Sequence, residues 1–208
     1  MKILLVLAVI FSGVCLRAAD FSKVVEGDVI FQKSQSSQSA AIQEASGSPW
    51  SHVGLVVKNN GKTYVAEAVQ PVRLTPIDQF IARGRGKEFI IKRFAFFDSE
   101  KMTPSLYSVI RKYIGKNYDI YFEFSDDRIY CSELIYKVFQ EVTGQEVGVV
   151  QKFKDMRLDG PYIQRLIQER LTSIGKELNL EEPIITPISQ LKANNMMTVL
   201  SSPGASVE

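Results

Sequence analysis

The chain has 208 residues, of which 45% are hydrophobic and 23% are charged. This length suits one domain with a sizeable core, and this composition is that of a globular protein, which excludes a disordered chain. With 25 basic and 23 acidic residues the net charge is only +2. Charge therefore gives no reason to expect nucleic acid or an anionic membrane surface as the main partner.

The start of the chain differs from the rest. Lys2 precedes a short apolar run, and the small residues Ala18 and Ala19 close it. A positive start, a short apolar stretch and small residues are typical of a secretory signal peptide, and the run is too short to span a bilayer of about 30 Å comfortably. We expect residues 1–19 to be a signal peptide. Residues 20–208 would then form one exported domain, periplasmic or secreted, without a transmembrane segment.

The first elements after this leader are predicted strands. Residues 29–31 form a short apolar run after a turn, and residues 34–51, rich in Ser and Gln, indicate a surface loop with about one helical turn. Two β-branched runs, residues 52–57 and 63–69, flank the Asn-Asn-Gly sequence at 59–61. This pattern predicts a β-hairpin.

Helices dominate the rest of the chain. Proline preceded by threonine is typical of a helix start. Further helices are indicated by apolar stripes, and two more apolar runs predict strands. The predicted starts are Thr75-Pro76, Thr103-Pro104 and Thr186-Pro187, the further helices are residues 131–142 and 161–171, and the strands are residues 89–94 and 196–200. Because strands and helices do not alternate regularly, the pattern favours an α+β domain with an antiparallel sheet.

One cysteine and one histidine remain if the leader and its Cys15 are removed: Cys131 and His52. Cysteine attacks as a thiolate, and both a helix N-terminus and a neighbouring imidazolium favour that anion. Cys131 opens the helix predicted at 131–142, so the first of these features is local. A structural role stays open for both residues, because a lone cysteine on an apolar stripe or a lone histidine is more often a packing residue.

Glu67 is unusual because it lies in an otherwise apolar strand, where a carboxylate is costly unless it is exposed or paired. A turn at Asn59 and Asn60 would place His52 directly opposite Glu67. A turn at Asn60 and Gly61 would make the two diagonal neighbours on one face. Either arrangement allows a carboxylate–imidazole hydrogen bond that orients the ring. The alternative is a charge that protects an edge strand.

Three segments together resemble a known family. They are SHVGLV at 51–56, YVAEA at 64–68 and YCSEL at 130–134. In this order they are similar to the permuted NlpC-type papain-like cysteine hydrolases, and within them to the YiiX-like branch. The resemblance extends over residues 27–144, with weaker similarity at 185–187. It implies a circularly permuted papain-like α+β fold, in which an antiparallel sheet packs against helices that include the nucleophile helix.

The resemblance also implies roles for four residues. Cys131 would be the nucleophile, His52 the base and Glu67 the residue that orients the base. Tyr118 lies in a segment similar to the Gly-x-x-Tyr sequence of the family, and would donate to the oxyanion beside the backbone N–H of Cys131. A packing role for Tyr118 stays open.

Neighbours of these residues are candidates for the substrate cleft: Trp50, Ser51 and Tyr130. A core role for Trp50 is the alternative. The basic segment at 83–87 lacks the spacing of a phosphate-binding loop and is interpreted as a solvated turn. Glu123, Asp126 and Asp127 cluster before Cys131, but no group of histidine and cysteine residues accompanies them. We therefore predict neither a metal nor another cofactor.

The function implied is that of a cysteine amidase or peptidase that works through a thioester, with peptidoglycan stem peptides or other peptides as substrates. One alternative is a lipid acyl hydrolase or acyltransferase like lecithin–retinol acyltransferase, although those relatives carry histidine where this chain has Glu67. Another is a non-catalytic binding module on the same fold. The sequence does not specify the oligomeric state.

Overall fold

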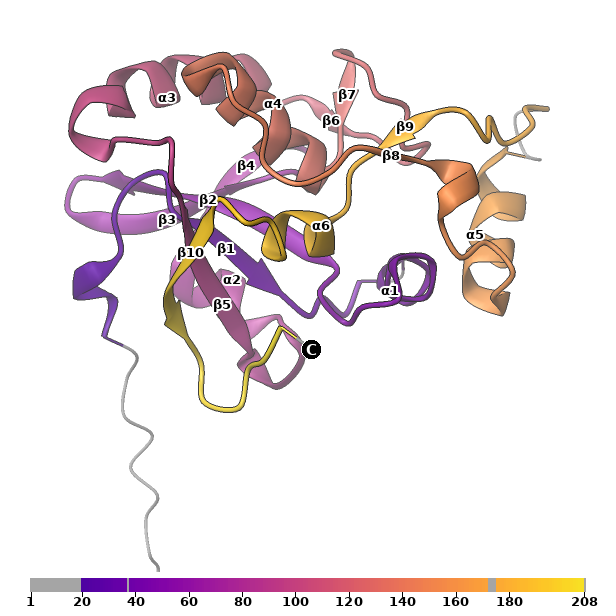
Figure 1. Cartoon of the computed structure of the whole chain (residues 1–208), viewed down its shortest axis with the longest axis horizontal. Helices are drawn as coiled ribbons and strands as arrows, with labels where there is room; N and C mark the ends of the chain where they lie inside the picture. Colours follow the sequence, from indigo (N-terminus) through magenta and orange to yellow (C-terminus); the bar gives the residue numbers. More distant parts are fainter. Residues whose placement is uncertain (1–19, 37, 172–174, 208) are drawn as a thin grey trace, which may run out of the picture.

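The computed structural model describes residues 20–36, 38–171 and 175–207 (Figure 1). The predicted signal peptide lies outside these residues. Within them, no helix has both the length and the apolar character that crossing a membrane requires.

A six-stranded sheet forms the centre of the molecule, with the strand order β10-β5-β1-β2-β3-β4 and every neighbouring pair antiparallel. Two small sheets accompany it: β6 pairs with β7 in parallel, and β8 pairs with β9 antiparallel. The strands are β1 (Val29–Gln32), β2 (His52–Asn59), β3 (Lys62–Glu67), β4 (Arg73–Pro76), β5 (Phe89–Phe94), β6 (Asn117–Tyr118), β7 (Arg128–Ile129), β8 (Gln151–Lys152), β9 (Pro183–Ile184) and β10 (Met196–Ser201).

Helices cover the sheet unequally. In Figure 1, α3 and α4 lie together above the sheet, and α1 and α5 lie together at one end. The α-helices are α1 (Ser39–Ser46), α2 (Ile77–Ala82), α3 (Ser99–Tyr113), α4 (Cys131–Thr143), α5 (Pro161–Leu171) and α6 (Pro187–Leu191), and the 3-10 helices are η1 (Phe21–Lys23), η2 (Arg85–Lys87) and η3 (Phe153–Asp155). The antiparallel sheet and its helices confirm the predicted α+β class.

Side chains on both faces of the central strands are buried, because alternate residues of one strand belong to two separate apolar clusters. Val53 and Leu55 of β2 belong to the main core together with residues of α3 and α4. Val56 of β2 and Val65 of β3 point to the opposite face, where Phe80 of α2 covers them in a second apolar cluster. The sheet is therefore a middle layer, and a polar side chain at the end of β2 or β3 lies close to helices.

The hairpin between β2 and β3 takes the second of the two predicted registers, with the turn at Asn60 and Gly61. Asn60 and Gly61 form the turn with φ of 48° and 76°, and Leu55 pairs with Ala66. Both central residues of such a tight turn need positive φ, which asparagine and glycine tolerate. His52 and Glu67 are therefore diagonal neighbours on one face of the sheet.

Two predicted helix starts are wrong. The α3 helix begins at Ser99, because the carboxylate of Asp98 accepts hydrogen bonds from the N–H groups of its first turn, and Pro104 lies inside the helix. Thr75 belongs to strand β4, and α2 begins at Ile77. The loop predicted at 34–51 contains a full helix, α1, rather than a single turn.

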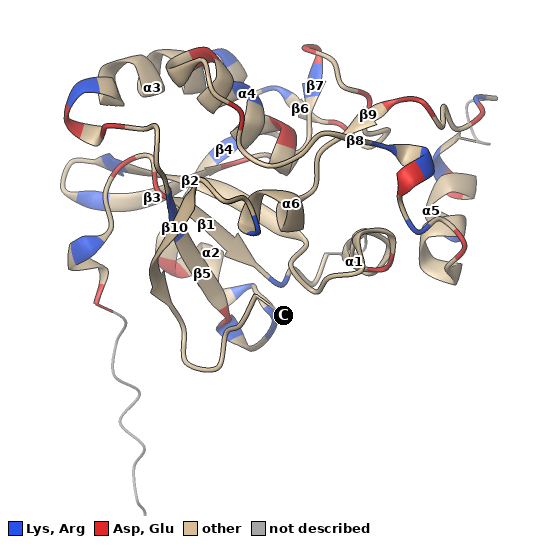
Figure 2. Cartoon of the chain, viewed as in Figure 1, with Lys and Arg blue, Asp and Glu red and all other residues tan. Residues whose placement is uncertain are grey.

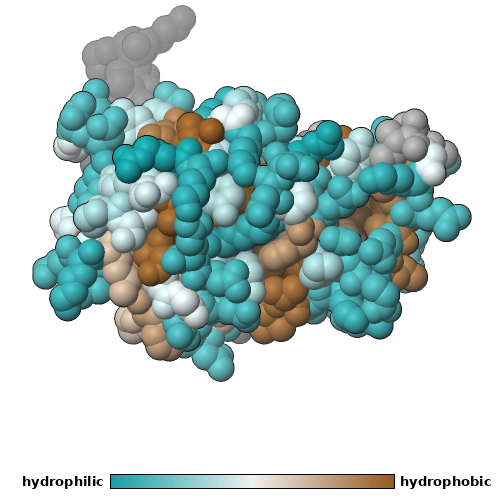
Figure 3. All heavy atoms as spheres, turned by 90° about the horizontal axis from the view of Figure 1, so that it is seen from above, coloured by the Kyte–Doolittle hydropathy of each residue, from teal (hydrophilic) through white to brown (hydrophobic). Residues whose placement is uncertain are grey.

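The surface carries both signs of charge throughout. Basic and acidic residues are interspersed along the helices and loops (Figure 2). Seen from above, the molecule is mainly hydrophilic, with separate apolar areas between polar ones (Figure 3).

Candidate active site

His52 and Glu67 form a buried pair at one end of the hairpin. His52 opens β2 and Glu67 ends β3, and the diagonal register brings His52 Nε2 to 2.7 Å from Glu67 Oε2. The carboxylate is fully buried and the ring is nearly so. The imidazole also stacks on Phe80 of α2, with ring centroids 5.6 Å apart. Glu67 thus fixes the edge of the imidazole ring, and Phe80 covers one of its faces.

Glu67 has two further partners. The hydroxyl of Thr75 on β4 donates to Glu67 Oε1 at 2.6 Å, and Arg83 Nη2 donates to Oε2. Burial by itself would raise the pKa of Glu67, but the hydrogen bonds and charges of His52 and Arg83 outweigh it and lower the pKa to about 2. Glu67 is therefore a carboxylate at any pH at which the protein would work.

Arg83 corrects the interpretation of residues 83–87 as a solvated turn, because its side chain reaches inward. Arg83 follows α2, which packs on β3 and β4, so the end of this helix lies beside the end of β3. Its guanidinium stacks on Phe80 at 5.0 Å from the ring centroid. Nothing local in the sequence indicates this partnership; it follows only from how α2 docks on the sheet.

Cys131 is the first residue of α4, where unpaired backbone N–H groups favour an anion. Its side chain is buried and hydrogen-bonds the ring of His52. Because Nε2 faces Glu67, Nδ1 is the nitrogen left for the sulfur. Burial alone would lower the pKa of His52, but Cys131 and Glu67 together raise it to about 9. The imidazolium is thus the stable form of His52 at neutral pH.

The start of α4 is fixed by hydrogen bonds on either side of the cysteine. The hydroxyl of Ser132 donates to Ile185 O at 2.8 Å, and Gln190 Nε2 donates to Ser132 O at 2.8 Å. Glu133 accepts from the backbone N–H of Tyr130 at 3.2 Å. These bonds hold the sulfur at a fixed place relative to the sheet.

Tyr118 of β6 is buried close to the sulfur. Its hydroxyl accepts a hydrogen bond from Gln38 Nε2 at 2.8 Å. Burial, followed by the nearby charge of Cys131, raises the pKa of Tyr118 well above its usual value. The phenol therefore stays protonated and is available as a neutral donor. The structure brings all four predicted residues together: Cys131, His52, Glu67 and Tyr118.

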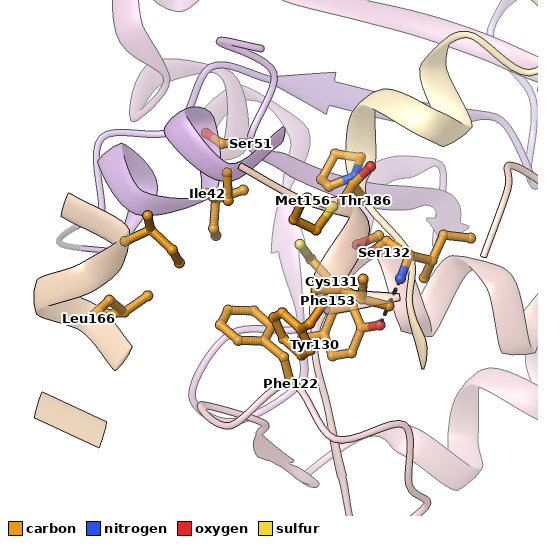
Figure 4. Close-up of a pocket in the computed structure, with 15 residues that line it drawn as sticks. Ile42, Ser51, Phe122, Tyr130, Cys131, Ser132, Phe153, Met156, Leu166 and Thr186 are labelled. Carbon is orange, nitrogen blue, oxygen red and sulfur yellow. Dashed lines mark hydrogen bonds between the residues drawn. The ribbon is translucent and has the colours of Figure 1, made fainter. Parts of the chain in front are cut away.

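Two different cavities meet at this group. An apolar pocket of about 50 Å³ has Cys131 in its wall, and Figure 4 shows the sulfur pointing into it. A wider groove of about 600 Å³ has His52 and Tyr118 in its wall together with the basic residues Arg83 and Arg170. The pocket beside the sulfur is thus narrow and apolar, whereas the groove beside His52 and Tyr118 is broad and carries polar and basic side chains as well as apolar surface.

Of the three residues predicted to line the substrate cleft, two do so and one does not. Ser51 and Tyr130 line the apolar pocket (Figure 4). Trp50 lines neither this pocket nor the groove: it is fully buried in the core, and its indole N–H donates to Ser206 O at 2.9 Å. Its assignment to the cleft was wrong, because a large aromatic ring stabilises most when it is fully buried.

The fold and the order of these residues along the chain, histidine, glutamate and then cysteine, define a papain-like protein with a circularly permuted sequence. A family model described as "Permuted papain-like amidase enzyme, YaeF/YiiX, C92 family" matches residues 23–200. The chain belongs to this family, as the resemblance of its three segments predicted.

Relatives from Escherichia coli support the assignment. "Uncharacterized protein YiiX" of strain K12 is 42% identical over 173 residues, which are 83% of this chain and 84% of the relative. The crystal structure of a protein described as metalloprotein yiiX from Escherichia coli O157:H7 is also 42% identical. It superposes with a TM-score of 0.79 and covers 85% of this chain and 97% of that one.

The description of that relative as a metalloprotein prompts a test of the residues present here. Within the described part of this chain, no group of three or more His, Cys, Asp or Glu side chains is arranged to hold a metal ion. Cys131, His52 and Glu67 are instead bonded to one another and to Arg83 and Thr75. The residues of the site therefore do not fit a resident metal.

Proposed function

We propose that the protein is a thiol amidase in which Cys131 attacks the carbonyl carbon of an amide and forms a thioester. The observation that carries this proposal is the contact between a sulfur at the N-terminus of α4 and the His52 ring, whose other nitrogen is bonded to Glu67. This arrangement has a nucleophile, a base and a residue that orients the base.

The cavities suggest how a substrate lies. The protonated His52 gives its proton to the departing amine, so the amine side of the substrate belongs in the groove that His52 lines. The acyl side then lies in the pocket that Cys131 lines, whose walls are mainly apolar. Because that pocket is narrow, it suits a thin alkyl chain or a small apolar side chain.

The reaction balances with these groups alone. The thiolate adds to the carbonyl carbon, and the oxyanion accepts hydrogen bonds from the Cys131 backbone N–H and the Tyr118 hydroxyl. The C–N bond breaks as His52 protonates the nitrogen, which leaves a thioester. His52 then takes a proton from water, the resulting hydroxide attacks the thioester, and the acid departs while the thiolate–imidazolium pair forms again.

A second candidate function is favoured by the apolar pocket: hydrolysis or transfer of a lipid acyl group. Both reactions pass through a thioester of Cys131, and the substrates differ in the acyl group that it carries and in the leaving group. An exported location would favour cell-wall peptides as the source of the amide, and we propose these as the first substrates to test.

The test is to incubate the protein with peptidoglycan fragments or with phospholipid vesicles and to weigh the intact protein by mass spectrometry. An adduct with the mass of a peptide acyl group supports the amidase, and a fatty acyl adduct supports the lipid enzyme. The Cys131→Ala variant should form neither adduct while unfolding at an unchanged denaturant concentration. Turnover that survives in Cys131→Ala would contradict both functions.

A further inference from the structure

A chain of three side chains leads from Tyr118 to the other end of the groove. Gln38 lies just before α1, Tyr118 lies in β6, and Arg170 lies near the end of α5. Arg170 Nη2 donates to Gln38 Oε1 at 2.6 Å, and Gln38 Nε2 donates to Tyr118 Oη at 2.8 Å. Three elements that are distant in sequence therefore converge on one hydroxyl.

The direction of these bonds is fixed chemically. A guanidinium has donors and no acceptor, so only the side-chain oxygen of Gln38 can face Arg170. The amide NH₂ of Gln38 must then face Tyr118, and the hydroxyl must accept this bond. The phenolic proton is left over: in the described part of the chain, Gln38 is the only hydrogen-bond partner of the Tyr118 hydroxyl.

Arg170 is a firm anchor for this chain. Its Nη1 donates to Ile120 O at 2.5 Å, and its guanidinium lies over the ring of Phe122, 5.5 Å from the centroid. Both contacts come from the segment that follows β6. The cation that orients Gln38 is thus tied to the same stretch of chain that carries Tyr118.

We propose that Gln38 and Arg170 are positioning residues that aim the phenolic proton of Tyr118 at the oxyanion. This inference rests on the proposed function, in which Tyr118 donates to that oxygen. A hydroxyl that already accepts a bond from a polarised amide is also a stronger donor, because hydrogen bonds in a chain reinforce one another. Arg170 and Gln38 therefore act through Tyr118 without touching the substrate.

The decisive variant is Gln38→Glu. A carboxylate at this position would keep the contact with Arg170 but would accept the Tyr118 proton and so withdraw it from the oxyanion. The probes are p-nitrophenyl butyrate, which acylates Cys131 through an oxyanion, and iodoacetamide, which alkylates it without one. We expect acylation to fall about 100-fold, as when one oxyanion donor is lost, while alkylation proceeds at the wild-type rate.

Two controls separate this effect from general damage. Gln168→Glu places the same charge on an exposed side chain of α5, outside the groove and two residues before Arg170, and should leave acylation close to wild type. In a Tyr118→Phe background, Gln38→Glu should cause no further loss, because there is no proton left to redirect. Additive losses in the double variant would overturn the proposal.

Arg170→Met provides a second route if Gln38→Glu does not fold. Without the cation the Gln38 amide is free to turn. We expect acylation to fall about 10-fold, which is less than the effect of losing a whole oxyanion donor, and alkylation to be unchanged. An equal loss in both reactions would show a merely structural role and refute the inference.

A direct measurement separates this inference from the proposed function. In the wild-type protein, NMR should show cross-relaxation between the Gln38 side-chain NH₂ protons and the ring protons of Tyr118. Its absence overturns the positioning role whatever the protein hydrolyses. A wild-type protein that shows the contact and is alkylated, but is never acylated, would contradict the proposed function and leave the hydrogen-bond chain supported.

Discussion

Two glutamates in this molecule are equally buried and yet have opposite acidities. Glu67 at the end of β3 and Glu133 in the first turn of α4 are both fully inaccessible to solvent. The pKa of Glu67 is lowered to about 2, whereas burial raises the pKa of Glu133 to about 7. Burial alone therefore does not decide the charge of either carboxylate.

The partners account for the difference. Glu67 receives hydrogen bonds from His52, Arg83 and Thr75. Glu133 accepts one backbone N–H and lies 2.9 Å from Lys137, and that lysine is shared with Asp126 at 2.7 Å.

The nearby carboxylate of Asp119 further disfavours the charged form of Glu133. A buried carboxylate stays ionised where its donors are dedicated to it, as those of Glu67 are beside the proposed base.

The largest effect is expected when the charge of Glu67 is removed. Glu67→Gln keeps the size of the side chain but removes the charge that holds His52 as an imidazolium. We expect acylation to slow on the order of 10⁴-fold, by analogy with loss of the orienting carboxylate in other triads, and the pKa of His52 to fall below about 9. An NMR titration of His52 measures this, and an unchanged pKa would contradict the pairing.

A second prediction concerns how the raised pKa of Glu133 makes the stability of the protein depend on pH. Since folding raises its pKa from 4.5 to about 7, the folded protein holds this proton more tightly than the unfolded chain does. The stabilisation is complete below pH 4.5 and is lost as the pH rises through about 7. Glu133→Gln cannot ionise, so it should match wild type in acid and be more stable by about 3 kcal/mol near pH 8.

Urea unfolding at the two pH values tests this prediction. Glu141→Gln, on an exposed side chain of the same helix, is the matched control and should change stability little at either pH. If Glu133→Gln is less stable than wild type near pH 8, the carboxylate is ionised at a lower pH than its surroundings imply.

The smallest effect should come from Thr75→Val, which removes one donor from Glu67 and preserves shape. A buried hydrogen bond to a charged carboxylate contributes about 1.5 kcal/mol, so acylation should slow by about 10-fold at most. The rate of the p-nitrophenyl butyrate burst provides the measurement. A loss as large as that of Glu67→Gln would mean that Thr75 has a role beyond its bond to Oε1.

The sequence predicted those parts of the site that depend on local structure. The Asn-Gly turn sets the register that brings His52 to Glu67, and an apolar stripe predicts the helix that Cys131 begins. The family resemblance added Tyr118. The predicted Thr-Pro starts at Thr75 and Thr103 failed because a strand pairing in one case and a stronger cap in the other overrode the local signal.

The supporting residues could not be predicted, because they depend on contacts between distant segments. Gln38 lies 80 residues from Tyr118, and Arg170 lies 132 residues from Gln38. Arg83 reaches Glu67 only because α2 docks under the hairpin. No periodicity or turn signal relates such positions, and their residue types are ordinary for a surface.

The tight turn at Asn60 and Gly61 makes the length of an exposed loop matter for chemistry. Insertions and deletions are normally well tolerated at such tips. Here, a change of one residue that is taken up as a register shift between β2 and β3 would turn Glu67 to the opposite side of the sheet, because side chains alternate along a strand. A shift in the register of this hairpin would therefore separate the imidazole from the carboxylate without changing either residue.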